Sequence, residues 1–193
     1  MKEKLCLLFC DYFQAEVEWL LKTEQYDDIK RVFYHANCDK TQQSQQVLDI
    51  ITAESNTAQV VVFAGQCLKS QLKAFENNDF HIESLDICFE LLLPVMPLHQ
   101  TLDEGAHLFT HGMIKRWEQI NQRWGFDEHA KQAFFAEGTK KLVLLSCPEI
   151  PIDEIKMNAI AAQLNLPWEK LEISLDYLEL RILSAIKRWQ KNN

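Results

Sequence analysis

The sequence is poor in glycine and proline, with five of each among its 193 residues. Together they fall well below an average usage of roughly 12%, which excludes collagen-like, low-complexity and loop-dominated chains. Long apolar runs are also lacking. The longest, such as residues 5–10, 60–64 and 91–96, are far shorter than the ~18 residues that a membrane-spanning helix needs. We therefore expect an ordered globular protein with no membrane partner.

Basic side chains are too few to form a nucleic-acid surface. The chain carries 20 Lys and Arg against 28 Asp and Glu, a net charge of −8, and no stripe of Lys and Arg is present. Since an acidic protein repels a phosphate backbone, nucleic acid is not an expected partner. The apolar run after residue 4 is too short for a signal peptide, and Asp11 follows it in place of a small-residue cleavage site, which predicts a cytoplasmic location.

The six cysteines lack the Cys-x-x-Cys spacing of zinc ribbons, and they are too sparse for a secreted disulfide scaffold. In the cytoplasm we expect them to be thiols. A glycine-rich phosphate loop, a Gly-x-Ser-x-Gly elbow and a His-Glu-x-x-His helix are also missing from the sequence. The common signatures of nucleotide-binding proteins, serine hydrolases and metalloproteases are therefore absent.

The chain does contain apolar strands that alternate with amphipathic helices. Runs typical of strands occur at residues 5–10, 29–34, 58–64, 80–85 and 141–146, and helical periodicity follows them; residues 29–34 are mixed and residues 80–85 alternate, whereas the others are largely apolar. Because parallel strands need crossover connections, this order predicts an α/β fold with a mostly parallel, Rossmann-like sheet of about five strands covered by helices on both faces. We expect one domain over residues 1–193, with a helical insertion at about residues 93–138.

Local patterns predict several further elements. Residues 88–93 are predicted to form a helix that the two following prolines break. A short strand is expected at residues 107–110, and His111–Gly112 is expected to form a turn after it. Pro167 is predicted to begin the last helix, which keeps one apolar face.

Sulfur-containing and polar side chains lie where the predicted strands end. In open parallel sheets ligands bind outside these carboxyl ends. Thiolates and imidazoles are ligands of transition metals, and activated thiols also react with electrophiles. The sequence thus predicts a site for a small-molecule ligand, a transition metal or a metal-containing cofactor. We expect metal ligation from Cys10, Cys67, Cys88 and His111, and cofactor binding from Asp11, Asp86 and Cys147.

Each of these residues also has a structural interpretation. Buried cysteines are commonly small apolar core residues, and Asp11 is more readily explained as the N-cap of the helix that follows it. Imidazole is the side chain that ordinarily titrates near neutral pH, so His35, His107 and His111 are each a candidate metal ligand or proton shuttle. A lone histidine is more often structural than functional, and the sequence leaves these alternatives open.

Several stretches, in their order along the chain, resemble the motifs of one family. They are Cys10 with Glu16-Val17, VFAGQC at residues 62–67, DICFELLL at residues 86–93 and EGAHLFTHGMIKRW at residues 104–117. Together with the last helix at residues 172–189, they make nearly the whole chain similar to the family catalogued as domain of unknown function 1638.

The sequence departs from that family at three places. The family usually has Cys-Gly where this chain has Gln66–Cys67, His-Asp-Cys at residues 86–88, and Pro-Gly at residues 111–112. Cys10 and Cys88 match in kind, Cys67 matches only after a shift of one position, and Asp86 replaces the family histidine. The resemblance implies a cytosolic protein with a small parallel-sheet core and a loose association with corrinoid-dependent methyl transfer, so a corrinoid is one cofactor to expect.

These features favour binding over turnover, because no nucleophile–base pair or metal triad follows from the spacing. One alternative is an enzyme of methyl or sulfur transfer with one cysteine as an activated thiolate. Another is a sensory or protein-interaction module in which the long last helix forms a homodimer. Catalytic residues for such an enzyme do not follow from the sequence.

Overall fold

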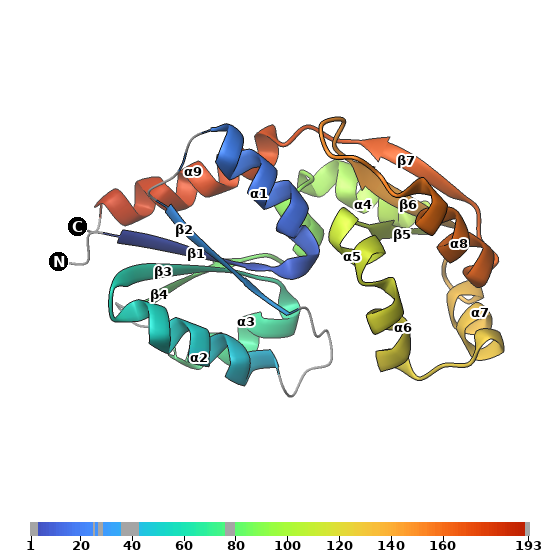
Figure 1. The fold of residues 1–193 in the computed structure, drawn as a ribbon, viewed down its shortest axis with the longest axis horizontal. Helices are drawn as coiled ribbons and strands as arrows, with labels where there is room; N and C mark the ends of the chain where they lie inside the picture. The colour runs from blue at the N-terminus through green and yellow to red at the C-terminus, as the bar shows by residue number, and fades with distance from the viewer. Residues whose placement is uncertain (1–3, 25, 27–28, 36–42, 76–79, 192–193) are drawn as a thin grey trace. The chain divides into compact units, whose positions relative to one another are not determined.

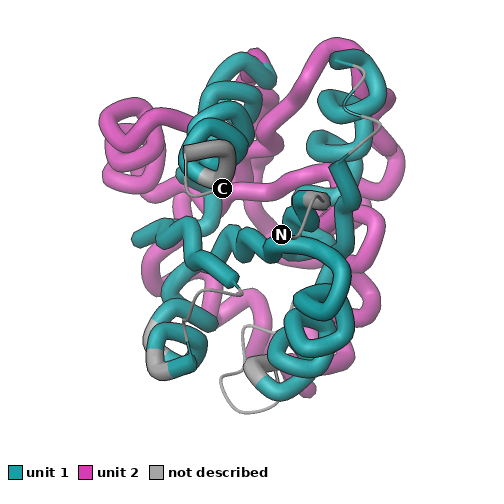
Figure 2. The backbone as a smooth tube through the Cα atoms, turned by 90° about the vertical axis from the view of Figure 1, so that its left-hand side faces the viewer, with its two compact units in different colours: residues 1–92, 175–193 teal, residues 93–174 magenta. Residues whose placement is uncertain are grey.

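The structure, a computed structural model, describes residues 4–24, 26, 29–35, 43–75 and 80–191. The chain divides into two compact units, which we call unit 1 (residues 1–92 and 175–193) and unit 2 (residues 93–174) (Figure 2). Unit 1 is therefore built from two separate pieces of chain, and each unit has its own sheet. The prediction of a single domain over residues 1–193 stays a prediction.

Unit 1 contains a four-stranded parallel sheet with the order β2-β1-β3-β4 (Figure 1). The central strands are apolar almost without alternation because helices cover both of their faces. All four strands lie where the sequence predicted them. They are β1 (Lys4–Cys10), β2 (Ile29–Tyr34), β3 (Ala58–Ala64) and β4 (Phe80–Ser84).

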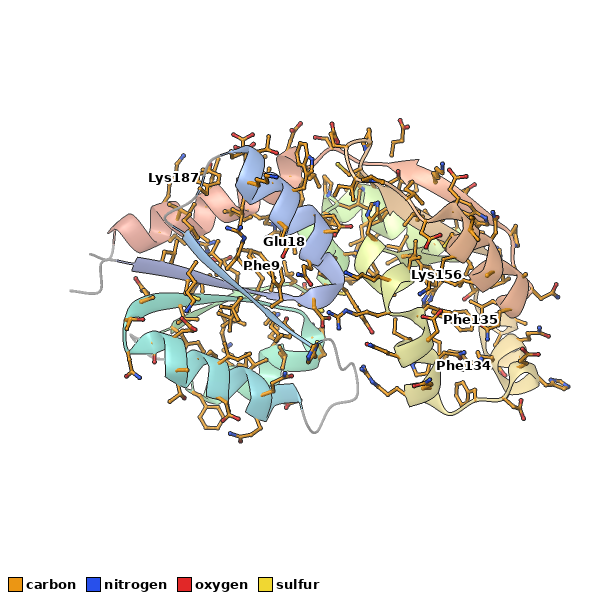
Figure 3. The ribbon with its side chains drawn as sticks, viewed as in Figure 1. Phe9, Glu18, Phe134, Phe135, Lys156 and Lys187 are labelled. Carbon is orange, nitrogen blue, oxygen red and sulfur yellow. The ribbon has the colours of Figure 1, made fainter. Side chains whose placement is uncertain are left out.

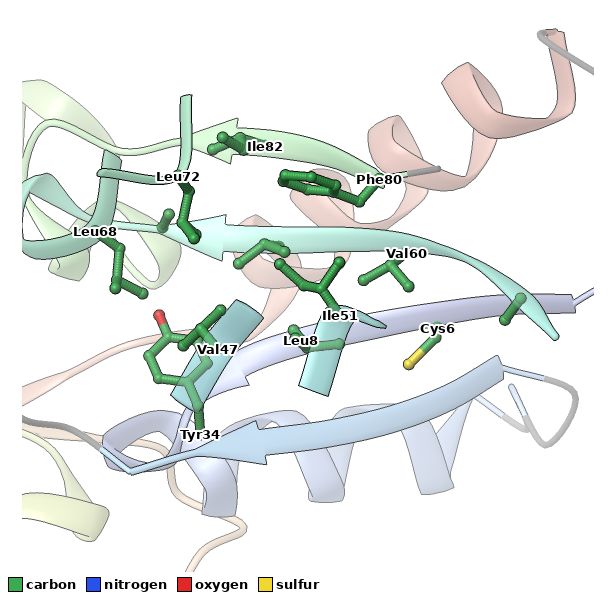
Figure 4. Packing of buried hydrophobic residues seen from close by; sticks show 13 residues of the cluster. Cys6, Leu8, Tyr34, Val47, Ile51, Val60, Leu68, Leu72, Phe80 and Ile82 are labelled. Carbon is green, nitrogen blue, oxygen red and sulfur yellow. The ribbon is translucent and has the colours of Figure 1, made fainter. Parts of the chain in front are cut away.

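Helices cover both faces of this sheet. On one face lie α2 (Gln43–Ser55) and α3 (Gln66–Leu72), and on the other lie α1 (Gln14–Thr23) and α9 (Asp176–Lys191) (Figure 1). On the α2 side, strand and helix side chains pack into one cluster that includes Leu8, Val60, Ile51 and Leu68 (Figure 4). A fully buried Val or Leu contributes about 2 kcal/mol through the apolar area that it removes from water. This cluster therefore holds α2 and α3 to the sheet.

The opposite face of the sheet packs under α1 and α9. Phe9 of β1 stacks on Phe63 of β3, with ring centroids 4.5 Å apart (Figure 3). Leu178 and Ile182 of α9 are fully buried, and Arg188 of the same helix pairs with Glu83 of β4. The apolar face on which we based the predicted homodimer thus packs inside unit 1.

Short 3₁₀ turns join some strands to helices in unit 1. They are η1 (Asp11–Phe13), η2 (Lys73–Phe75) and η3 (Cys88–Leu91). Asp11 lies within η1 and is not the N-cap of α1, so its predicted capping role is wrong.

The two prolines after η3 were predicted to break a helix at residues 88–93, but they have other positions in the structure. Residues 88–93 form only the short η3 turn, and Pro94 is the N-cap of α4 (Val95–Asp103). Pro97 lies in the first turn of α4, where a backbone N–H has no intrahelical partner, so this proline does not break the helix.

Unit 2 contains a three-stranded parallel sheet with the order β5-β6-β7. Its strands are β5 (Ala106–Phe109), β6 (Lys141–Ser146) and β7 (Trp168–Glu172). Besides α4, its helices are α5 (His111–Lys115), α6 (Trp117–Trp124), α7 (Glu128–Ala136) and α8 (Glu154–Leu164). The range 93–138, predicted as a helical insertion, thus contains β5 as well as helices.

The two parallel sheets with their flanking helices confirm the predicted α/β class. The strands of the described residues are divided between a sheet of four and a sheet of three, and the predicted number of about five is roughly right. Among the helices of the described ranges, none is long and apolar enough to cross a bilayer.

Two local predictions in unit 2 are wrong. Pro167 precedes strand β7 and does not begin a helix, and its carbonyl accepts a hydrogen bond from the Leu142 N–H at 2.9 Å. Trp168 and Leu171 of β7 are half-buried and three residues apart, a spacing that is typical of helices, and α9 begins only at Asp176. The predicted turn at residues 111–112 is instead the start of α5, whose N-cap Thr110 accepts a hydrogen bond from the N–H of residue 113 at 3.3 Å.

Aromatic rings and one lysine hold the elements of unit 2 together. Phe135 of α7 lies with its ring centroid 5.0 Å from that of His107 on β5 and 5.7 Å from that of Trp124 on α6 (Figure 3). Lys156 of α8 donates hydrogen bonds to the Lys115 carbonyl at 3.1 Å and to the Glu118 carboxylate at 2.7 Å. Unit 2 therefore has a core of its own.

Candidate functional site

Backbone pairing between the two central strands of unit 1 ends early at the carboxyl edge, and we call the place where it ends the opening. Pairing between β1 and β3 stops at Leu8 and Val62, two residues before either strand ends, although β1 still pairs with β2 and β3 with β4. Beyond this point the Phe63 carbonyl accepts a hydrogen bond from the buried Tyr34 hydroxyl, at 2.9 Å. A side chain of β2 thus satisfies a backbone group next to the opening.

The opening coincides with the place where the chain changes its direction across the sheet. From β1 the chain moves outward to β2, and it then crosses back to β3 on the other side of β1. The segments after β1 and β3 leave toward opposite faces, to α1 and α3 (Figure 1). In open parallel sheets such a topological switch point is the usual place for a ligand.

Two of the predicted metal ligands flank this opening. Cys10 is the last residue of β1, and Cys67 lies in the first turn of α3, directly after β3 and Gly65. Both side chains are half-buried and pack against the hydrophobic cluster on the α2 side of the sheet. The structure therefore brings Cys10 and Cys67 to the same edge and the same face of the sheet.

Cys88 reaches this edge from the neighbouring strand. A methyl group at Gly65 would lie 3.2 Å from the Cβ of Cys88, so the segment after β4 runs close to the segment after β3. The carboxylate of Glu90 accepts hydrogen bonds from the backbone N–H groups of Asp86 and Ile87, at 3.4 and 3.2 Å. A buried carboxylate thus fixes the turn that carries Cys88.

The carboxylate of Asp11 forms a pair with the imidazole of His35. Asp11 Oδ2 lies 2.8 Å from His35 Nδ1, and the two residues directly follow the paired strand ends Cys10 and Tyr34. The aspartate is 2% exposed, whereas the histidine is 68% exposed. A buried carboxylate therefore orients a largely exposed imidazole.

Asp86 takes a different position from the cysteines. Its side chain is 73% exposed and lies 3.0 Å from Lys69 Nζ and 3.4 Å from Gln66 Nε2, both on α3. These contacts link the turn after β4 to α3. An exposed ion pair of this kind contributes little to stability.

The remaining predicted residues, His111 and Cys147, belong to unit 2. They follow the neighbouring strands β5 and β6 at the carboxyl edge of the second sheet. Cys147 is buried, and its thiol donates a hydrogen bond to Glu149 Oε2 at 2.7 Å. The predicted site residues therefore lie at the carboxyl edges of two separate sheets, five in unit 1 and these two in unit 2.

Cys6 and Cys38 are not among the predicted site residues. Cys6 is fully buried on β1, and burial, reinforced by the nearby Glu54 carboxylate, raises the pKa of its thiol to about 12. Cys38 lies outside the described residues. Within the described ranges, no group of three or more His, Cys, Asp or Glu side chains is arranged to hold a metal ion.

Some residues of this edge were not predicted from the sequence. Tyr34 and Glu90 look like ordinary strand and helix residues in the sequence, and only the strand register and the turn geometry show their hydrogen bonds to the backbone. His35 was a candidate by itself. Its pairing with Asp11 follows from a feature that the sequence did contain, because both residues come directly after predicted neighbouring parallel strands.

A comparison with known families identifies the family of this chain. The profile of the family described as protein of unknown function (DUF1638) matches residues 31–181, more than half of the chain. The chain belongs to the DUF1638 family. The DUF1638 match includes His35, Cys67, Asp86, Cys88, His111 and Cys147, and it begins after Cys10 and Asp11. No curated protein and no solved structure gives a significant match to this chain.

Proposed function

We propose that this DUF1638 protein acts in the cytoplasm by binding a small ligand at the carboxyl edge of its four-stranded sheet. The site lies at the opening between β1 and β3, and the thiols of Cys10, Cys67 and Cys88 are its soft donors. The proposed ligand carries either a thiol-reactive carbon centre or a soft metal. The observation that carries the proposal is the early end of the β1–β3 pairing at a topological switch point.

The position of the thiols supports this proposal. Cys10 and Cys67 flank the opening, and the Cβ of Cys88 lies against Gly65. They are half-buried, unlike the fully buried Cys6, so a ligand can reach sulfur that is still partly shielded from water. Partly exposed thiols are the ones that bind metals and react with electrophiles.

The corrinoid suggested by the family resemblance remains one candidate for such a ligand. Its cobalt is a transition metal, and thiolates and imidazoles are ligands of transition metals. The residue types at this edge are therefore suitable ligands for it. His111 and Cys147 stay predictions as ligand residues, and they belong to the edge of the other sheet.

The test is to look for a ligand on the protein and then to remove single thiols. Protein purified without chelator is analysed for metals by elemental analysis and for small molecules by native mass spectrometry. The Cys10→Ser, Cys67→Ser and Cys88→Ser variants are then compared with Cys6→Ala, which removes a thiol from the same strand and face as Cys10 but away from the edge.

The proposal expects bound material in the wild type and in Cys6→Ala, and less of it in each of the three edge variants. Titration with Co²⁺ provides a second measurement, since a thiolate bound to cobalt gives charge-transfer absorption. Absence of any copurified metal or small molecule, together with a Co²⁺ titration that is identical in the edge variants and in Cys6→Ala, would contradict the proposal.

A further inference from the structure

The turn that carries Cys88 is held by a residue of the last helix as well as by Glu90. The Glu90 carboxylate accepts hydrogen bonds from the N–H groups of Asp86 and Ile87, at 3.4 and 3.2 Å. Arg181 of α9 lies against the same carboxylate, with its Nη2 3.9 Å from Glu90 Oε2. This distance is that of an ion pair without a hydrogen bond. Charge attraction therefore links α9 to the turn.

Burial gives this ion pair more weight than a surface pair has. The side chain of Glu90 is 9% exposed and that of Arg181 is 28% exposed. A buried carboxylate costs free energy unless hydrogen-bond donors and a positive charge compensate it. The two backbone N–H groups supply the donors, and Arg181 supplies the charge. Without Arg181 we expect the carboxylate to move toward water and its hydrogen bonds to the turn to weaken.

The packing of α9 holds Arg181 in this place. Leu178 and Ile182 of the same helix are fully buried, so the helix is fixed against the sheet. Arg181 Nη2 lies 3.2 Å from the Tyr177 hydroxyl, and the guanidinium carbon lies 5.3 Å from the centroid of the Tyr177 ring. The buried Nε has no hydrogen-bond acceptor among the residues that the structure describes. The contacts with Tyr177 and Glu90 thus orient the guanidinium.

The position of the Cys88 thiol depends on this turn, because Cys88 directly follows the bonded backbone. Ile87 is the N-cap of η3, and Cys88 is the first residue of η3. Leu91 and Leu92 are buried and hold the end of the turn. Movement at the start of the turn therefore moves the half-buried thiol.

We propose that Arg181 is a positioning residue of the ligand site at the β1–β3 edge, and that it holds the Cys88 thiol in place through Glu90. This inference rests on the proposed function for the role of Cys88 as a donor, and it adds the control of that donor by the last helix. The place of one ligand-binding thiol is thus set by a segment that follows all of unit 2 in the chain.

Alkylation by iodoacetamide tests the position of the thiol, since this reagent is a small molecule with a thiol-reactive carbon centre. Peptide mass spectrometry gives the rates at Cys88 and Cys67 in the native protein, at a high pH at which the rate reports access to the thiolate. In Arg181→Gln we expect Cys88 to react several-fold faster than in the wild type, because the turn opens more often, and Cys67 to keep its rate. Nuclear magnetic resonance should show faster amide hydrogen exchange at residues 86 and 87 in this variant.

Arg188→Gln is the matched control. Arg188 belongs to the same helix and also pairs with a largely buried glutamate, Glu83 of β4. The variant removes the same charge and an ion pair of the same kind, but it leaves the turn at Cys88 intact. It should therefore keep the wild-type rate at Cys88 and the wild-type amide exchange at residues 86 and 87.

Two results would overturn the inference. One is a Cys88 rate in Arg181→Gln that is no faster than in the wild type. The other is an equal acceleration of Cys88 in Arg181→Gln and Arg188→Gln, which a general loss of stability would produce.

If Arg181→Gln does not fold, Arg181→Lys is compared with Arg188→Lys in the same way. Lysine keeps the charge but loses the contact with the Tyr177 hydroxyl that orients it, so a smaller acceleration at Cys88 is expected in Arg181→Lys alone. Failure of the proposed function appears in other data, as identical Co²⁺ titrations and ligand contents in the thiol variants, while the Cys88 rate still depends on Arg181.

Discussion

Cys6 and Cys10 lie on the same face of β1, four residues apart, but their thiols have different surroundings. Burial raises the pKa of Cys6 to about 12, with a second contribution from Glu54, whereas Cys10 is half-buried at the strand end. Only the thiolate is nucleophilic. In the native protein we therefore expect iodoacetamide to label Cys10 and to leave Cys6 unmodified, as measured by peptide mass spectrometry.

The control for this labelling is the unfolded protein, in which both thiols should react alike. Cys6→Ala should leave the labelling of Cys10 unchanged. Equal labelling of Cys6 and Cys10 in the native state would contradict the burial of Cys6.

The imidazole of His107 makes the stability of unit 2 depend on pH. Burial between the rings of Phe109 and Phe135 lowers its pKa from 6.5 to about 4. Between these values the unfolded chain binds a proton that the folded protein does not. The free energy of unfolding of unit 2 is therefore highest above pH 6.5 and falls as the pH drops toward 4. Because the ring is partly exposed, we expect a loss of about 2 kcal/mol, less than the full shift implies.

Urea unfolding at several pH values measures this dependence. His107→Phe keeps the aromatic contacts and removes the titrating group, so the free energy of unfolding of the variant should depend less on pH between 6.5 and 4. The same pH dependence of unfolding in the wild type and in His107→Phe would contradict the assignment.

At the scale of elements, the Tyr34 hydroxyl stabilises the place where β1 and β3 separate. Tyr34→Phe keeps the ring and leaves the Phe63 carbonyl without this donor. An unsatisfied buried carbonyl costs about 1–3 kcal/mol, and we expect a loss of that size in the free energy of urea unfolding. Tyr177→Phe is the matched control, because the Tyr177 hydroxyl contacts Arg181 in a more exposed place, and it should cost less than Tyr34→Phe.

The close approach of Gly65 to the turn at Cys88 gives a second prediction at this scale. Gly65→Ala places a methyl group 3.2 Å from the Cys88 Cβ, so η3 must shift by a few tenths of an ångström. We expect a stability loss of about 1 kcal/mol and faster labelling of Cys88. Gly138→Ala meets nothing within 4 Å and should change neither quantity. Equal effects of the two substitutions would contradict the close approach.

The elements show what a sequence pattern can and cannot predict here. β1 and β3 are buried on both faces, and their continuous apolar runs predicted them correctly. β7, an edge strand of its sheet, was missed because its half-buried residues are three apart, a spacing that is typical of helices. Pairing between strands is a property of register, so the division into two sheets did not follow from the pattern of any single strand.

Only part of the candidate site was predicted, again because the order of strands in a sheet does not follow from the pattern of single strands. Polar and sulfur-containing residues after strands mark a carboxyl edge, and Cys10, Cys67 and Cys88 do lie at one edge. The edge to which each strand belongs depends on strand order. His111 and Cys147 therefore belong to the other sheet, although their positions after strands looked equivalent.

At the scale of the whole molecule, each unit has its own core, and α9 belongs to the core of unit 1. Ile182→Ala removes a fully buried side chain from this helix, and we expect unit 1 to lose about 2–4 kcal/mol. Hydrogen exchange followed by mass spectrometry should show faster exchange in β1, β3 and β4, with little change in β5 and β6.

Leu180 provides the matched control because it lies on the same helix and is 62% exposed. Leu180→Ala should leave the exchange of both sheets unchanged. A uniform increase of exchange over the two sheets in Ile182→Ala would mean that the units do not have separate stabilities.

The position of α9 in the chain has a consequence for synthesis on the ribosome. The strands of unit 1 and α1 are made first, but α9, which covers part of the same face as α1, follows only after all of unit 2. Until then Phe9 and its neighbours on that face lack this cover. The nascent chain thus presents an uncovered apolar surface while some eighty further residues are translated, which makes this interval the one in which chaperone binding or misfolding is most expected.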